Sequence, residues 1–229
     1  GQYADGWLGP RKGDPAVGLS KGSKKEKEDP WPVFVVLKGL IQFWEVSGDK
    51  RIIPAIDQFL NCLDTLLNDN PLDSWAAQRW GEGLLSVQWL SEQTGNNSLL
   101  SLAKKLQQQG FNWQGLFSDY PYLRRTSFSD RSRAAHVVNN AMAIKYPALW
   151  WLISGKSTDL SMSTHMINTL DRWHGQATGL FTGDEHLAGK NPSQGTELCA
   201  VVEYMYSLEH LFSITGKIGF ADRLERIAY

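Results

Sequence analysis

The sequence has little cysteine, no excess of one charge sign and no long apolar run, and each shortage removes a class of protein. Two cysteines in 229 residues cannot form a disulfide framework. The formal net charge of -1 gives no electrostatic reason to expect nucleic acid or an anionic membrane as a partner. No apolar run reaches the roughly 20 residues that a membrane-spanning helix needs. No P-loop, dinucleotide-binding glycine pattern or zinc-finger spacing is present.

Tryptophan, by contrast, is abundant, with ten residues. Because Trp is large, rigid and amphipathic, such an excess fits a thick helical core, or a groove in which flat apolar ligand faces stack. Core packing is the better explanation for most of the ten. The chain begins with Gly rather than Met and stops inside a run of helical character. We therefore expect a fragment of a longer protein.

Four stretches of the chain follow one plan, in which an apolar run is followed by Ser or Thr, then Gly, then a second amphipathic run. The glycines are Gly48, Gly95, Gly155 and Gly216. Glycine enters the left-handed conformation at little cost, so a glycine after a periodic apolar run predicts the end of a helix. Each stretch therefore predicts a helix, a tight turn and a second helix.

The first helix of each predicted pair is the more apolar one. These helices cover residues 31–46, 80–93, 136–153 and 197–214. The second helix is amphipathic, with apolar residues at the spacing of one helical face, as in Ile52, Ile53, Ile56, Phe59 and Leu60. Inner helices that are buried all round, with outer helices that have one wet face, predict an all-α ring of at least four helical hairpins.

The connections that enter the inner helices are long and rich in Gly, Pro, Asp and aromatic residues, notably residues 4–15, 118–133 and 178–196. Long structured loops on a helical scaffold usually carry function, and these loops would meet at one end of the ring. We expect the site there. The run at 21–29 has mixed charges and no apolar residue, which predicts a solvated, mobile loop without function.

Polar residues recur near the starts of the inner helices and in the loop before the last one. Because burial of polar groups without partners is costly, this regularity predicts a lined pocket. The main candidates are His136, Glu185, Glu197 and Cys199, and the last loop also offers His174, Gln176, Asp184 and His186. Taken singly, the four main candidates are better explained as a core or capping histidine, a loop carboxylate, a first-turn acid after a Thr196 cap, and a core cysteine.

The combination of these residues points to chemistry more strongly than any one of them. Glu185 and Glu197 lie on either side of a glycine-rich loop and can converge at one mouth of the ring. Paired carboxyl groups in different environments are the standard means of cleaving glycosidic bonds. Surplus tryptophan suits stacking on sugar rings. Cys199 beside Glu197 also offers two ligands of a possible zinc site.

The segment 174–229, which begins HGQATGLFTGDEHLAGKNPSQGTELC, resembles the β-L-arabinofuranosidase-like glycoside hydrolases of family 127, a former domain of unknown function. ADGWLGP at 4–10, DPWPVFVVLKGLIQFWEVSGDKR at 29–51 and HVVNNAMAIKYPALWW at 136–151 fit the same family. The resemblance implies an (α/α)6 toroid of six hairpins, usually followed by β-sandwich domains. Residues 1–229 are then expected to be a partial toroid, a catalytic domain whose terminal hairpins and any β-sandwich domains are missing.

The resemblance also implies roles for particular residues. Characterised members hold a zinc ion with a glutamate and three cysteines, one of which attacks the anomeric carbon with retention. The glutamate-any-cysteine motif corresponds to Glu197 and Cys199, which makes both zinc ligands, and the acid/base glutamate corresponds to Glu185. His136 corresponds to a histidine that contacts the sugar. The remaining ligands, including the nucleophile, are expected downstream of Tyr229, so this fragment alone is expected to be inactive.

Asp5 and Trp7 are further candidate sugar contacts. Characterised arabinofuranosidases carry histidines where this sequence has Trp-Pro at 31–32 and Arg-Trp at 79–80. The pocket is therefore expected to be less polar on that side, and the expected sugar is widened from L-arabinofuranose to L-arabinofuranose or a similar sugar. Two alternatives to hydrolysis stay open, namely an inactive toroid that binds glycans by tryptophan stacking, and an epimerase or lyase on the same fold. In each case the predicted partner is a carbohydrate.

Overall fold

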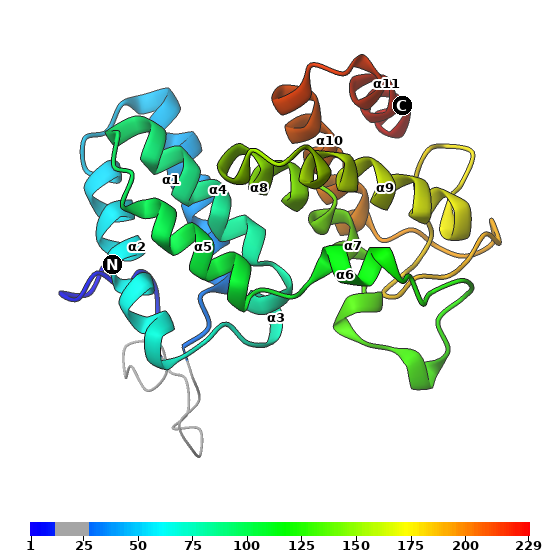
Figure 1. The fold of residues 1–229 in the computed structure, drawn as a ribbon, viewed down its shortest axis with the longest axis horizontal. Coiled ribbons are helices and arrows are strands. Elements are labelled where there is room, and N and C mark those ends of the chain that lie inside the picture. Colours follow the sequence, from blue (N-terminus) through cyan, green and yellow to red (C-terminus); the bar gives the residue numbers. More distant parts are fainter. Residues whose placement is uncertain (12–27) are drawn as a thin grey trace. The chain divides into compact units, whose positions relative to one another are not determined.

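The computed structural model describes residues 1–11 and 28–229, and Figure 1 shows these as α-helices joined by loops. Most of the run at 21–29, predicted to be a solvated loop, lies outside the described residues. In the described part the extended segments pair only as isolated bridges. No helix there is both long enough and apolar enough to cross a bilayer. The chain divides into two compact units, Gly1–Phe111 and Asn112–Tyr229.

The first unit contains two helical hairpins. Its helices are α1 (Trp31–Ser47), α2 (Ile52–Asp69), α3 (Ser74–Gln78), α4 (Trp80–Thr94) and α5 (Leu99–Gln109). The inner helices α1 and α4 pack on each other, and the outer helices α2 and α5 do the same. Gly83 allows the close approach of α1 to α4, because a Cβ there would lie 2.9 Å from the ring of Phe34. Phe34, Ile56, Phe59 and Leu60 are fully buried in this core.

The second unit carries the other two hairpins and the longest loops. Its helices are α6 (Trp113–Ser118), α7 (Val137–Ala143), α8 (Tyr146–Ser154), α9 (Ser157–His174), α10 (Leu198–Thr215) and α11 (Ile218–Ala228). The 3-10 turns η2 (Phe128–Asp130) and η3 (Arg133–Ala135) precede α7. Helix α7 packs on α10, α8 on α9, and α10 on α11. Every residue of α7 is buried, and the hydroxyl of Ser207 on α10 donates to the carbonyl of Ala141 at 2.7 Å.

The predicted glycine turns are confirmed at all four positions. The glycines end α1, α4, α8 and α10 with φ angles of 64°, 68°, 67° and 65°. Each N–H donates to the carbonyl of the fourth residue before it, at 2.7 to 2.8 Å. A residue with a side chain pays a steric penalty in this left-handed region, which is why glycine occupies it in every hairpin.

The third inner helix, predicted to be continuous over 136–153, is instead two helices separated by Ile144 and Lys145. Pro147 explains the break, because its ring nitrogen has no hydrogen to donate to the carbonyl of Ala143 and its ring crowds that carbonyl. Proline is instead well tolerated in the first turn of α8, where it lies. Lys145 is fully buried at the break and its Nζ lies 3.6 Å from a carboxylate oxygen of Glu203 on α10.

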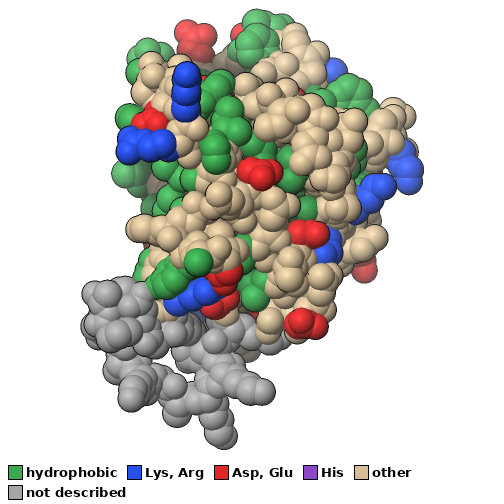
Figure 2. Space-filling model, turned by 90° about the vertical axis from the view of Figure 1, so that its left-hand side faces the viewer, with side chains coloured by type: hydrophobic (Ala, Val, Ile, Leu, Met, Phe, Trp, Pro, Cys, Tyr) green, Lys and Arg blue, Asp and Glu red, His purple; other side chains and the backbone are tan. Residues whose placement is uncertain are grey.

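The expectation that the inner helices are buried all round holds for α7 but is wrong for α1 and α10. On α1, Val36 is 51% exposed and Val46 is 90% exposed, while Leu198 on α10 is 73% exposed. Helix α1 is buried along one stripe only, through Val33, Phe34 and Leu37. On the face drawn in Figure 2, acidic and basic side chains are scattered among hydrophobic and other side chains, in keeping with the near-zero net charge.

Candidate active site

The loop between α9 and α10 is folded back on itself and onto the start of α7 by backbone hydrogen bonds. Gly183 N–H donates to Gly195 O and Glu197 N–H donates to Gly183 O, both at 2.9 Å. Val137 N–H donates to Glu185 O at 3.0 Å, which lays the same loop against the first residue of α7. A side chain at Gly183 would collide with the backbone of His186, so the fold needs glycine at this crossing.

These bonds bring His136, Glu185 and Glu197 together. Each offers a ligand atom within 4.8 Å of the ligand atoms of the other two. His136 Nε2 lies 3.6 Å from Glu185 Oε2. The side chain of His136 is 9% exposed and that of Glu185 is 64% exposed, so the cluster has a buried histidine and a carboxylate open to solvent. The two carboxylates therefore converge beside the histidine, and their chemical roles stay predictions.

His136 is both the N-cap of α7 and a member of this cluster. Its Nδ1 accepts a hydrogen bond from the N–H of Asn139, at 3.4 Å. A ring nitrogen that accepts carries no proton, so the neutral imidazole holds its proton on Nε2, the atom nearer Glu185. The capping interpretation and the functional one are thus not alternatives, because the cap fixes which nitrogen faces the site.

Glu197 and Cys199 lie at the start of α10 in different surroundings. Glu197 itself is the N-cap, so the predicted Thr196 cap is wrong. Its backbone conformation is extended, with φ of -64° and ψ of 129°, which places it outside the first helical turn. Cys199 is a free, exposed cysteine, so its interpretation as a core residue is also wrong. Cys199 is not in the cluster of three ligand atoms found among the described residues.

His174, which the sequence offered as a pocket residue, instead holds two loop segments together. It is fully buried, its Nδ1 accepts from Gly189 N–H at 2.9 Å, and its Nε2 lies 2.8 Å from the carbonyl of Tyr122. With Nδ1 accepting, Nε2 is the donor to Tyr122. Burial lowers the pKa of His174 to about 4, so the ring is neutral at pH 7. It fastens the segment 119–135 to the loop that carries Glu185.

His186 lies next to the cluster. Its ring centroid lies 6.0 Å from that of His136, and the two residues form an antiparallel bridge. The pKa of His186 is lowered, first by burial and then by the positive charge of Arg131, against the opposing effect of Glu185. Sequence reasoning did not single out Arg131. The signal for it was the concentration of arginine in the preceding long loop.

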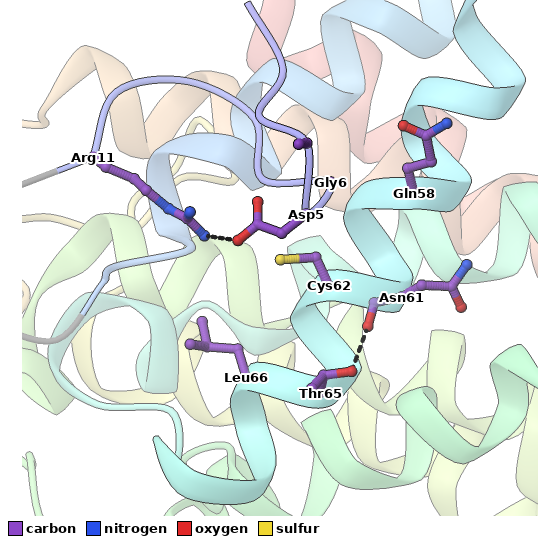
Figure 3. Close-up of a pocket in the computed structure, with 9 residues that line it drawn as sticks. Asp5, Gly6, Arg11, Gln58, Asn61, Cys62, Thr65 and Leu66 are labelled. Carbon is purple, nitrogen blue, oxygen red and sulfur yellow. Dashed lines mark hydrogen bonds and ion pairs between the residues drawn. The ribbon is translucent and has the colours of Figure 1, made fainter. Parts of the chain in front are cut away.

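Asp5 and Trp7, the other predicted sugar contacts, lie in the first unit, and Figure 3 shows Asp5 with the residues around it. Asp5 and Arg11 line a pocket of about 550 Å³ and form an ion pair at 2.6 Å, and the hydrogen bond from Arg11 lowers the pKa of Asp5. Cys62, on α2, is part of the same wall. Trp7 is 2% exposed and packs on Phe59, with ring centroids 5.5 Å apart. It therefore has a packing role and no open ring face for a sugar.

The donor types of the cluster, one imidazole and two carboxylates, are ones that zinc and related divalent ions accept. Ligation through Nε2 of His136 would require the proton to move to Nδ1, which already accepts from Asn139. The carboxylate of Glu197 requires no such change. Glu197 therefore fits a metal site better than His136. Cys199 lies two residues further along, in the first turn of α10, and is exposed.

Comparison with known proteins gives one family match. A family model described as β-L-arabinofuranosidase, GH127 catalytic domain, matches residues 2–229. No curated protein matches the chain.

Solved structures resemble the chain in fold. An inactive variant of an alpha-1,6-mannanase of glycoside hydrolase family 76 from Salegentibacter sp. HEL1_6, in complex with alpha-1,6-mannotetrose, has a TM-score of 0.61 and 14% identity, covering 90% of this chain and 61% of that one. A polysaccharide lyase has a TM-score of 0.55 and 15% identity, covering 91% of this chain and 30% of that one. The chain thus spans less than two thirds of either. The predicted all-α fold of the six-hairpin toroid type is confirmed.

Proposed function

Because the chain belongs to the β-L-arabinofuranosidase family of GH127 catalytic domains, we propose that it is the catalytic part of a retaining glycoside hydrolase that releases L-arabinofuranose or a similar sugar from glycans. The observation that carries the proposal is the convergence of Glu185 and Glu197 beside His136. The oligosaccharide bound to the mannanase of the same fold supports a carbohydrate ligand.

Glu185 is the proposed acid/base. Its side chain is 64% exposed, so a glycosidic oxygen can reach it, while its backbone is fixed by the bond from Val137. It would give its proton to the leaving oxygen in the first step and accept a proton from water in the second. His136, with its proton held on Nε2 by the Asn139 cap, is placed to donate a hydrogen bond to a sugar hydroxyl.

Glu197 and Cys199 are the proposed zinc ligands. When bound, zinc would keep a thiol ligand deprotonated at neutral pH, which makes sulfur a nucleophile. The proposed set of one glutamate and three cysteines needs two more thiols besides Cys199. The sequence has one other cysteine, Cys62, and it lies on α2 in the first unit. The proposal therefore requires that the complete protein supply two more cysteines.

The function is tested by assaying the complete protein on aryl glycosides of L-arabinofuranose, L-arabinopyranose and D-mannose, with the released anomer followed by NMR. We expect release of a furanose with retained anomeric configuration. Binding of glycans without any release would favour the binding toroid. An unsaturated product from a galacturonic acid oligosaccharide, which has the carboxylate that β-elimination needs, would indicate a lyase. A product epimeric at one carbon would indicate an epimerase.

Cys199→Ser in the complete protein should lower zinc affinity at least about 100-fold, because changes to outer-shell residues alone cost about 10- to 100-fold. Metal content after dialysis against a weak chelator measures it. Since Cys199 is exposed, the melting temperature of the zinc-free protein should stay within about 2 °C of the zinc-free parent. Cys62→Ser is the matched control and should keep full zinc content. Equal zinc content in the parent and the Cys199 variant would contradict the assignment.

A further inference from the structure

The segment leading into α7 concentrates positive charge next to the candidate site. Within residues 124–133, read as RRTSFSDRSR, there are four arginines and one aspartate, in a chain of net charge -1. The arginines are all exposed, namely Arg124, Arg125, Arg131 and Arg133. The aspartate, Asp130, is bonded to the hydroxyl of Ser127 in its own turn. A local excess of positive charge of this kind attracts anionic ligands.

This basic segment is attached directly to the loop that carries Glu185. Thr126 N–H donates to Leu187 O at 2.9 Å, and Leu187 N–H donates to Ala135 O at 3.0 Å. The two bonds hold both ends of the segment to a residue that is two positions from Glu185. The charge of Arg131 also acts on His186, the immediate neighbour of Glu185. A ligand that contacts this segment is therefore within reach of the candidate acid/base.

Phe128 and Arg131 form a pair suited to a sugar that carries a carboxylate. Phe128 is 84% exposed, and the guanidinium carbon of Arg131 lies 5.0 Å from the centre of its ring. An aromatic ring offers a face on which the C–H side of a pyranose can stack. A guanidinium binds a carboxylate with two parallel hydrogen bonds. In the described part of the chain, Arg131 has no carboxylate partner of its own.

We propose that residues 124–133 form a subsite for an acidic sugar, so that the glycan acted on at Glu185 carries a uronic acid, with Phe128 as its platform and Arg131 pairing its carboxylate. The inference rests on the proposed function and deepens it. Attachment of the segment to the Glu185 loop favours a glycan over a nucleic acid or an anionic lipid surface, because one ligand then occupies both places.

The test is equilibrium binding by the complete protein of a galacturonic acid oligosaccharide and of its carboxyl-reduced form, by titration calorimetry at low salt. We expect the acidic form to bind more tightly, and Arg131→Gln to lower that preference by about 2- to 5-fold, as for an exposed ion pair. Affinity for the reduced form should be unchanged. The preference should weaken as salt is raised, because exposed charges are screened.

Arg172→Gln is the matched control, because Arg172 is also exposed and stacks on Trp173 but belongs to the outer helix α9. It should keep the full preference. Equal binding of both oligosaccharides, or equal losses in the two variants, would overturn the subsite. So would equally tight, Arg131-dependent binding of an RNA oligomer or of phosphatidylserine vesicles. Hydrolysis of a neutral aryl glycoside is read separately, so failure of the subsite and failure of the proposed function are distinguishable.

Discussion

Replacing Glu185 by glutamine in the complete protein should lower kcat on a natural glycan by about 10²- to 10⁴-fold, the usual contribution of a positioned acid or base. The amide is the same size and can still hydrogen-bond, but it has no proton to give to a leaving oxygen. The fold should not change, because the side chain is 64% exposed and the bond from Val137 uses the backbone of residue 185. The melting temperature should stay within about 2 °C of the parent.

The leaving group distinguishes loss of an acid from general damage. Dinitrophenolate leaves a glycoside without being protonated, so the rate of bond breaking on a dinitrophenyl glycoside should be nearly normal for Glu185→Gln. An alkyl glycoside, whose leaving oxygen needs a proton, should show the full loss of rate. Asp184→Asn is the control, since it removes the same charge from the neighbouring exposed residue, which is outside the cluster. Glu185 would not be the acid/base if Glu185→Gln lost the same factor in rate on the dinitrophenyl and alkyl glycosides. The same conclusion would follow if Asp184→Asn lost as much rate as Glu185→Gln.

The helical hairpins were predictable because their signals are local. An apolar run and a glycine after it suffice to end a helix, and all four predicted glycines adopt the left-handed conformation. Even the break between α7 and α8 had a local signal in Pro147, which the continuous apolar pattern of 136–153 concealed. The buried face of α1 was not predictable. Its apolar residues lie on every side of the helix, so the sequence does not indicate which side packs against other helices.

The site depended on information that is not local. The loop that joins Glu185 to Glu197 is held by bonds of Gly183 to Gly195 and of Val137 to Glu185, which no periodicity encodes. The resemblance pointed to the glutamates, but only the structure shows that His136 caps α7 through one nitrogen and faces Glu185 with the other. For Trp7 the sequence pointed towards the site, but this aromatic residue of a long loop is buried in a core.

The stability of the protein should fall as the pH is lowered from about 6.5 towards 4, and His174 should account for a large part of the change. Its pKa is about 4 in the folded protein, against 6.5 for a free side chain. Between these values the unfolded chain binds a proton that the folded chain excludes. The contribution of His174 to the free energy of unfolding is of the order of 3 kcal/mol. It is fully present above pH 6.5 and is lost as the pH falls towards 4.

His174→Gln separates this residue from other groups that titrate in acid. Glutamine keeps an acceptor for Gly189 N–H and a donor for the carbonyl of Tyr122, but it does not titrate. Urea unfolding at pH 7 and at pH 4.5 should show a smaller fall in the free energy of unfolding for the variant than for the parent. His165→Gln, which alters an exposed histidine bonded to the carbonyl of Phe117, should keep the parental fall. If the free energy of unfolding of His174→Gln falls as much as that of the parent, the acid sensitivity lies in other groups. His174 would then hold the two loops together without making the stability depend on pH.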